Sequence, residues 1–210
     1  TWTKKDFKDI HFKGPGTDLR VGLADDHEWM GGASMAQNGV ICNPNIPSEE
    51  VFTTPHALRV EGYVSSTKPL SHQGTLIDNI RVVFEKGSIT DAKASKGETV
   101  LKKVLESDEG ARRLGEVALV PNSSPISNSG LLFYNTLFDE NAACHIALGQ
   151  CYSKCFRGEK NLSASEISER GGNSSMIHID WMIGSGEIDI DGFGKNGEIV
   201  PIFRKGEWVD

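Results

Sequence analysis

Short stretches in which apolar and polar residues alternate dominate this sequence. Residues 19–23 and 58–64 each place an apolar residue or glycine at every second position. This period of two predicts half-buried β-strands, because successive side chains of a strand point to opposite faces. The stretches 76–84 and 88–92 flank Lys86 and Gly87, and this arrangement predicts a hairpin with glycine in its turn.

The alternation returns near the C-terminus. In residues 176–183 it places Ile177, Ile179 and Trp181 on one face of an expected strand. Residues 187–192 and 198–203 predict a final pair of strands, joined by the turn sequence Gly-Lys-Asn-Gly. Most of the expected secondary structure is therefore β.

Helices are expected in only one part of the chain. The apolar residues of 99–105 recur at helical spacing, and Ser107 or Asp108 is placed to cap a second short helix that runs through residues 112–114. The stretch 121–130, rich in Ser, Asn and Pro, predicts a long loop. The sequence therefore predicts one α+β domain over residues 1–210, a β-rich sheet domain with a few helices.

The charge of the chain argues against two classes of partner. The 210 residues carry a net charge of −7, from 29 acidic and 22 basic residues without long runs. Nucleic-acid binding needs a clustered basic face, so no nucleic-acid partner is expected. No apolar run approaches the roughly 20 residues that cross a bilayer, and no polybasic patch is present, so no membrane partner is expected either.

The cysteines do not form a recognisable pattern. Cys42, Cys144, Cys151 and Cys155 match neither a CxxC zinc motif nor an extracellular disulfide framework. Four free thiols in a reducing cytoplasm are the expected state.

The clearest sign of chemistry is the sequence His178-Ile-Asp180. On a strand, the imidazole and the carboxylate project from the same face, while Ile177, Ile179 and Trp181 pack on the other. A His and an Asp on one face can form half of a site for a borderline metal. The alternative is a hydrogen-bonded structural pair, which is the commoner meaning of an isolated His-x-Asp sequence.

A second group lies in residues 139–152, where Asp139, Glu140 and His145 fall within seven residues. If this segment is helical, His145 and Tyr152 share a face; if it is extended, they do not. In the structural alternative, Asp139 and Glu140 cap a helix and Tyr152 is a core aromatic residue. Periodicity alone leaves these possibilities open.

Weaker signals come from single acids. Glu116 opens an apolar strand, and the adjacent Glu49 and Glu50 lie in a proline-flanked loop; such acids are usually solvated. The remaining histidines, at positions 11, 27, 56 and 72, are expected to be surface or structural. The phosphate-binding glycine loop, the HExxH helix and the GxSxG elbow are absent. Together, the acids and the two histidines form a mixed oxygen and nitrogen set that suits two adjacent Zn, Co or Mn ions.

Four longer strings resemble the thermophilic-type metalloaminopeptidases, which include aminopeptidases S, T and II and PepS. These strings are PSEEVFTTP, RRLGEVALVP, LFDENAACHIALG and NSSMIHIDWMIG, which begin at residues 47, 112, 137 and 173. The resemblance runs from about Gly16 to Trp208. It covers only the C-terminal half of that family, so the chain is expected to be the catalytic domain of a longer two-domain enzyme, without its N-terminal domain.

The resemblance also implies a role for individual residues. The implied metal ligands are Glu50, Glu116, Glu140, His145, His178 and Asp180, and the implied catalytic residues are Tyr152 and Glu116. Glu116 would bridge the two ions, and Glu49 would be a solvated neighbour of Glu50. Two divalent ions (Zn, Co, Mn or Mg) would activate a water molecule, Glu116 or Glu50 would take its proton, and Tyr152 would donate a hydrogen bond to the oxyanion.

The implied function is removal of N-terminal residues from peptides with a free N-terminus by a bacterial, cytoplasmic homodimer. Two other functions fit the same residues. The ligand set could serve a dinuclear phosphoesterase or amidase, which only the family strings argue against. Alternatively, the chain is a metal-binding and dimerising fragment that needs the missing N-terminal domain for turnover.

Overall fold

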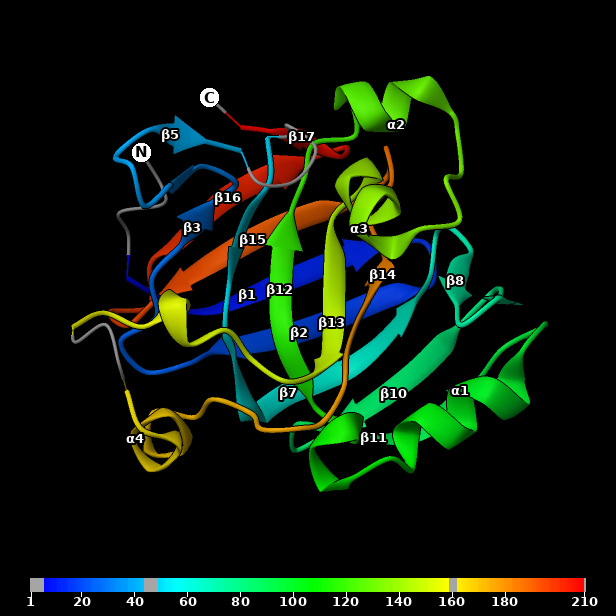
Figure 1. Cartoon of the computed structure of the whole chain (residues 1–210), viewed down its shortest axis with the longest axis horizontal. Helices are drawn as coiled ribbons and strands as arrows, with labels where there is room; N and C mark the ends of the chain where they lie inside the picture. Colours follow the sequence, from blue (N-terminus) through cyan, green and yellow to red (C-terminus); the bar gives the residue numbers. More distant parts are fainter. Residues whose placement is uncertain (1–5, 44–48, 159–161, 210) are drawn as a thin grey trace.

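Two antiparallel sheets make up most of the computed structural model, which describes residues 6–43, 49–158 and 162–209. The larger sheet has the strand order β11 (Ser88–Lys93), β10 (Arg81–Glu85), β7 (Pro55–Ser65), β2 (Thr17–Leu23), β1 (Phe7–Gly14), β15 (Asp189–Gly194), β16 (Ile199–Arg204) and β17 (Glu207–Trp208). The smaller sheet has the order β14 (His178–Met182), β13 (His145–Gly149), β12 (Leu114–Leu119), β6 (Val51–Thr53) and β3 (Met30–Gly31). In Figure 1 the smaller sheet lies across one face of the larger sheet.

The remaining elements are short. Two small hairpins pair β4 (Ser34–Met35) with β5 (Ile41–Cys42), and β8 (Leu70–His72) with β9 (Thr75–Ile77). The α-helices are α1 (Glu98–Leu105), α2 (Pro125–Ser129), α3 (Thr136–Asp139) and α4 (Ala164–Glu169). Single 3₁₀ turns are η2 (Glu109–Arg112), η3 (Glu140–Ala142) and η4 (Ser153–Cys155). Within the described ranges, no helix is long and apolar enough to cross a membrane.

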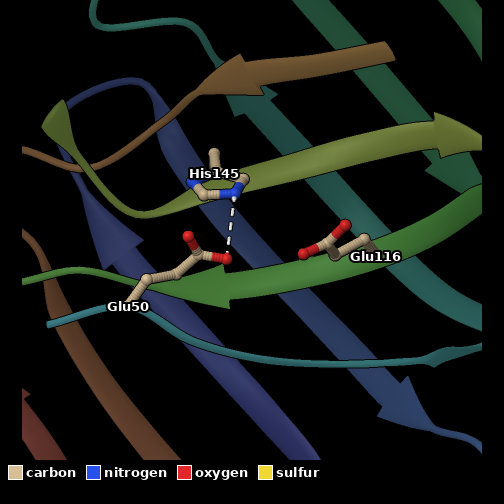
Figure 2. A group of neighbouring side chains, drawn as sticks. All are labelled: Glu50, Glu116 and His145. Atoms are coloured by element: carbon tan, nitrogen blue, oxygen red, sulfur yellow. Dashed lines mark ion pairs between the residues drawn. The ribbon is translucent and has the colours of Figure 1, made fainter. Parts of the chain in front are cut away.

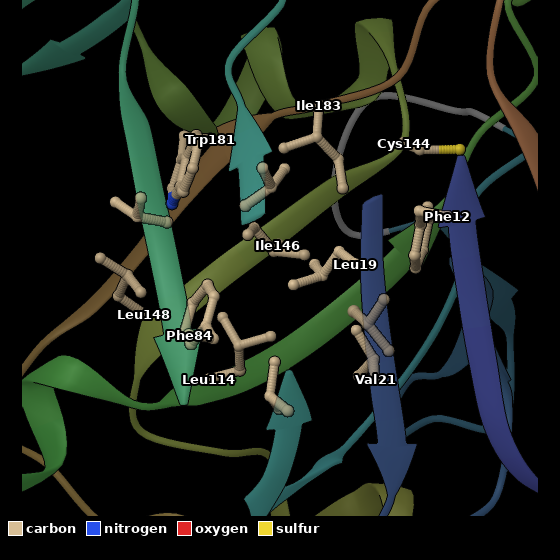
Figure 3. Packing of buried hydrophobic residues seen from close by; sticks show 14 of the residues in the cluster. Phe12, Leu19, Val21, Phe84, Leu114, Cys144, Ile146, Leu148, Trp181 and Ile183 are labelled. Carbon is tan, nitrogen blue, oxygen red and sulfur yellow. The ribbon is translucent and has the colours of Figure 1, made fainter. Parts of the chain in front are cut away.

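The main hydrophobic core fills the space between the two sheets. Phe12, Leu19 and Val21 of the larger sheet meet Ile146 and Trp181 of the smaller one, and all five are almost completely buried (Figure 3). Both sheets present alternate residues to this layer, as the period of a strand requires. Residues of the smaller sheet that do not point into the core therefore lie on its opposite, outer face.

Thr54 marks the point where the chain leaves one sheet for the other. It lies between β6 of the smaller sheet and β7 of the larger, and it is fully buried. Its backbone carbonyl accepts a hydrogen bond from the Ala24 N–H at 3.0 Å, and its hydroxyl donates to the Tyr152 carbonyl at 3.3 Å. These bonds satisfy polar groups that would otherwise be buried without a partner.

Several predictions made from periodicity are confirmed. Residues 19–23 lie in β2, residues 99–105 lie in α1, and 88–92 lie in β11, which pairs with β10 through the turn at Lys86 and Gly87. Asp108 caps η2, because its carboxylate accepts a hydrogen bond from the Ala111 N–H at 2.9 Å. The β-rich α+β class is confirmed as well.

Other predictions are wrong in detail. Leu58 is 58% exposed, because the pairing of β7 with β2 shifts register between Val60 and Pro55 and Leu58 lies in this irregular stretch. The expected strand 76–84 is two strands, β9 and β10, separated by Asn79 with φ of 50°. A left-handed residue interrupts a strand, which accounts for the break.

Three further features of the secondary structure differ from the prediction. The expected loop 121–130 contains α2, which is capped by the Ser124 hydroxyl and has Pro125 in its first turn. The second short helix ends before Leu114, which starts β12. A third strand, β17, follows the expected final pair β15 and β16.

Candidate metal centre

The outer face of the smaller sheet, turned away from the core, carries the polar residues of β14. Ile179 and Trp181 pack into the core, so His178 and Asp180 project together from the opposite face. This is the arrangement that the period of two predicts for the His-x-Asp sequence. Asp180 is nevertheless buried, and His178 is only partly exposed, so other segments cover this face.

A bulge brings Glu116 to the same face. The pairing of β12 with β13 shifts register between Leu114 and Glu116, so Leu114 and Val117 both reach the core while Glu116 points outward. The bulge requires a glycine at position 115, because a Cβ there would lie 2.3 Å from the Gln150 carbonyl oxygen, closer than non-bonded atoms can approach. Glu116 is buried, in contrast to the usual solvated acid at a strand edge.

The segment around His145 is helical at its start and extended at its end. Asp139 ends α3, Glu140 begins η3, and His145 begins β13. The register pairs Ala147 of β13 with Glu116 on one side and with Asp180 on the other. A small residue between two acids on one face leaves room there for a ligand or an ion.

Both histidines are held in the same way. His145 Nδ1 lies 3.0 Å from the Ala143 carbonyl oxygen, and His178 Nδ1 lies 2.7 Å from the Gln150 carbonyl oxygen. A carbonyl oxygen only accepts, so Nδ1 carries a proton in both rings and Nε2 is the nitrogen left to bind a metal. This is the usual arrangement of a histidine that binds a metal through Nε2.

Two groups of potential ligand atoms meet at Glu116. Glu50, Glu116 and His145 offer atoms that all lie within 4.8 Å of one another, and so do Glu116, His178 and Asp180. Figure 2 shows the first group, in which His145 Nε2 lies 4.0 Å from Glu50 Oε1. In the second, His178 Nε2 lies 3.2 Å from Glu116 Oε2 and 3.5 Å from Asp180 Oδ1.

A cavity of about 140 Å³ opens onto these residues. It is lined by Gly31, Gly32, Ser34, Glu50, Phe52, Glu116, Leu137, Glu140, His145, Tyr152, Lys154 and Asp180. Glu140 therefore shares the cavity, although it belongs to neither three-residue group. Glu49 is exposed, as expected for the solvated neighbour of Glu50. Of the expected proline-flanked loop, residues 47 and 48 lie outside the described residues, and Val51–Thr53 form strand β6 instead of a loop.

Tyr152 reaches this cavity although the segment is extended. His145 begins β13 and Tyr152 lies beyond the end of that strand, yet both line the same cavity. The chain turns after β13 at Gly149, whose φ is 100°, and Tyr152 then lies beside the sheet. Its ring centroid is 4.6 Å from that of His178.

The electrostatics of the cluster follow from the burial of several acids together. Burial and the Asp180 carboxylate raise the pKa of Glu140 to about 8, and burial raises the pKa of Glu116. Burial opposes ionisation of Asp180, but the neighbouring His178 outweighs it and lowers the pKa of that carboxyl. In the same way, burial lowers the pKa of the two imidazoles, but the carboxylates outweigh it and raise the pKa of His145 to about 9 and of His178 to about 11.

The cluster is thus short of positive charge, and its geometry fits a divalent cation. His178 Nε2 and Asp180 Oδ1 are buried and make no hydrogen bond. They lie 3.5 Å apart but are not aligned as donor and acceptor. A buried polar atom without a partner costs free energy, and a metal ion would satisfy both atoms. Imidazole and carboxylate ligands suit Zn, Co and Mn.

The cavity also contains residues that carried no signal in the sequence. Gly31 and Lys154 are far apart in the chain and lie in none of the four strings. The remaining described histidines are surface or structural, as expected: buried His27, for example, bonds the Ala24 carbonyl through Nδ1 at 2.9 Å. All four cysteines are free, and Cys42 is exposed.

Comparison with known proteins gives the family of the chain. The family model described as thermophilic metalloprotease (M29) matches residues 1–208. Aminopeptidase T of Thermus aquaticus is 55% identical over 206 residues, which are 98% of this chain and 50% of the relative. Aminopeptidase 2 of Geobacillus stearothermophilus is 51% identical over 205 residues, again 98% of this chain and 50% of the relative.

A solved structure agrees with the sequence relatives. Wild-type AmpT from Thermus thermophilus superposes with a TM-score of 0.91 at 53% identity, over 97% of this chain and 50% of that chain. The chain spans about half the length of the relatives it matches. The family resemblance found in the four sequence strings is confirmed, and the chain belongs to the thermophilic metalloprotease (M29) family.

Proposed function

We propose that this chain forms the catalytic domain of a metal-dependent aminopeptidase, which hydrolyses the first peptide bond of peptides with a free N-terminus. One observation carries the proposal: two groups of potential ligands share Glu116 and open onto one cavity. The relatives that match the chain are aminopeptidases, which supports the reaction class over a dinuclear phosphoesterase or amidase.

Each ion has its own set of ligands in this proposal. Glu50 and His145 would hold one divalent ion, His178 and Asp180 would hold the other, and Glu116, which belongs to both groups, would serve both ions. Glu140 completes the set from the wall of the cavity. Zn, Co, Mn or Mg ions bound there would supply Lewis-acid activation of a water molecule and of the scissile carbonyl.

The chain itself supplies proton transfer and oxyanion stabilisation. Glu116 or Glu50 accepts the proton of the attacking water, because both carboxylates face the cavity. The Tyr152 hydroxyl donates a hydrogen bond to the oxyanion that forms on the substrate carbonyl. Burial and the neighbouring acids, Glu116 first, raise the pKa of Tyr152, so its phenol keeps the proton that this role requires.

The size of the chain leaves a second function to test. Since it spans half the length of its relatives, the alternative is a metal-binding and dimerising unit without turnover. A homodimer in the cytoplasm is part of the main proposal.

The first experiment measures metal content and turnover in one preparation. Elemental analysis gives the bound metal, and cleavage of leucine p-nitroanilide with added Co²⁺ or Zn²⁺ gives the activity, with p-nitrophenyl phosphate as the competing substrate. Metal together with chelator-sensitive cleavage of the anilide supports the aminopeptidase. Metal without cleavage favours the unit without turnover, and cleavage of the phosphate ester alone would refute the reaction class.

A matched pair of variants tests the ligands. Glu50→Gln removes a charged ligand atom and should weaken metal binding by about 100-fold or more, because even outer partners of metal ligands contribute 10–100-fold. Glu49→Gln makes the same change at the adjacent exposed acid and should leave metal content unchanged. Equal metal content in the two variants would contradict the assignment of Glu50.

A further inference from the structure

Lys154 is the one lysine or arginine among the described residues that line the cavity. It shares this wall with four acids, namely Glu50, Glu116, Glu140 and Asp180. In the described part of the chain no carboxylate lies within ion-pair distance of its ammonium group. A cation at the mouth of an acidic cavity without a paired acid is available to an anionic group of the substrate.

The backbone on both sides of Lys154 is rigidly held. Lys154 is the middle residue of η4, between Tyr152 and the fully buried Cys155. The Cys155 N–H donates to the Tyr152 carbonyl at 3.1 Å, and the Cys155 carbonyl accepts from the Glu28 N–H at 2.7 Å. The turn therefore fixes where the lysine side chain starts.

Two aromatic rings fix where the side chain ends. The Lys154 ammonium lies 4.7 Å from the centroid of the Phe52 ring and 5.2 Å from that of Tyr152. Both distances are within the range of a cation–π interaction. Phe52 and Tyr152 also contact each other edge to face, with centroids 5.9 Å apart. An ammonium group held in this way loses less side-chain entropy when it binds an anion.

The burial of the lining residues places this cation at the outer end of the cavity. Glu116 is buried and Lys154 is exposed, and the Tyr152 ring contacts both ends of this path: its centroid lies 4.6 Å from that of His178 and 5.2 Å from the Lys154 ammonium. The bond to be cleaved would lie at Glu116, and the second residue would then extend toward the exposed Lys154. In a dipeptide, that second residue carries the free C-terminal carboxylate.

We propose that Lys154 binds the C-terminal carboxylate of a dipeptide and makes dipeptides the preferred substrates of this cavity. The inference rests on the proposed aminopeptidase function and adds its substrate class. The ammonium donates a charge-assisted hydrogen bond to a carboxylate oxygen. An amidated C-terminus is neutral and accepts a weaker hydrogen bond from the same ammonium. Longer peptides lack a carboxylate at this position.

The test compares leucyl-alanine with leucyl-alanine amide. The unaltered chain should have a kcat/KM about tenfold higher for the free acid, the lower end of what a hydrogen bond to a charged group contributes. In Lys154→Gln the ratio of the two kcat/KM values should fall to about one, and in Lys154→Arg most of it should remain. Lys103→Gln, which removes an exposed lysine of α1, is the matched control and should keep the ratio.

Each outcome decides between defined alternatives. A ratio near one in the unaltered chain, or a ratio unchanged in Lys154→Gln, overturns the inference while the aminopeptidase function stands. An equal fall for both substrates in Lys154→Gln also overturns it, because the lysine would then act on the oxyanion beside Tyr152. If Lys154→Gln lowers the kcat/KM of leucyl-glutamate amide but not that of leucyl-alanine, the lysine binds a side-chain carboxylate of the second residue, and the inference is overturned. If neither dipeptide is cleaved, the proposed function fails, and the substrate class fails with it.

Discussion

Gly149 couples the backbone of the smaller sheet to the position of His178. It is the last residue of β13, has φ of 100°, and pairs with His178 across the sheet. A Cβ at this position would lie 2.2 Å from the carbonyl oxygen of Ile177 and 2.8 Å from its carbonyl carbon. These are backbone atoms directly before His178, so Gly149→Ala must move either β13 or the start of β14.

Two free energies add in this variant. Alanine in a left-handed conformation costs roughly 1–2 kcal/mol, and forcing atoms into a well-packed region costs roughly 1–3 kcal/mol more. Gly158→Ala isolates the first cost, because Gly158 has φ of 107° and a Cβ there would meet no atom within 4 Å. The free energy of unfolding should therefore fall by about 2–5 kcal/mol in Gly149→Ala and by about 1–2 kcal/mol in Gly158→Ala.

Urea unfolding of the two variants in the presence of chelator measures these costs, since a metal bound to the folded state would mask them. A metal titration of each variant then measures the effect on the site. Gly149→Ala should bind metal more weakly because His178 shifts, and Gly158→Ala should bind as the unaltered chain does. Equal destabilisation of the two variants, or unaltered metal affinity in Gly149→Ala, would refute this account of the close backbone approach.

Three further predictions follow from the site and its surroundings. His178→Ala should remain folded by circular dichroism yet lose bound metal, and an unchanged metal stoichiometry would contradict its assignment as a ligand. Tyr152→Phe should keep its metal content but lose most turnover of leucine p-nitroanilide, and turnover at the parent rate would exclude the oxyanion role. In the native chain only the thiol of Cys42 is exposed, so a thiol reagent should titrate one cysteine before unfolding and four after it.

Local patterns in the sequence predicted those features that depend on neighbours along the chain. The strand at 19–23, the helix at 99–105 and the turn at Lys86 and Gly87 all involve residues in direct succession. The common face of His178 and Asp180 belongs to the same class, because it follows from the period of a strand. The full ligand set did not come from such patterns; it came from the resemblance to a family.

Features that depend on contacts between distant segments were not predictable in this way. Gly115 is required by the Gln150 carbonyl of a neighbouring strand end, and Leu58 is exposed because β7 and β2 pair irregularly. Lys154 reaches the cavity only because η4 packs beside β6, 102 residues earlier in the chain. No periodicity within any one of these segments contains that information.

The packing of the core therefore determines the geometry of the candidate metal centre. Ile179 and Trp181 are buried between the sheets, and their burial fixes the register of β14. A slip of one residue would exchange the faces of the strand, bury His178 and Asp180 in the core, and turn both apolar residues outward. The free energy that opposes this slip comes from apolar burial, not from any ion. The hydrophobic layer can thus hold the ligands of β14 in place before a metal binds, which lowers the entropic cost of binding it.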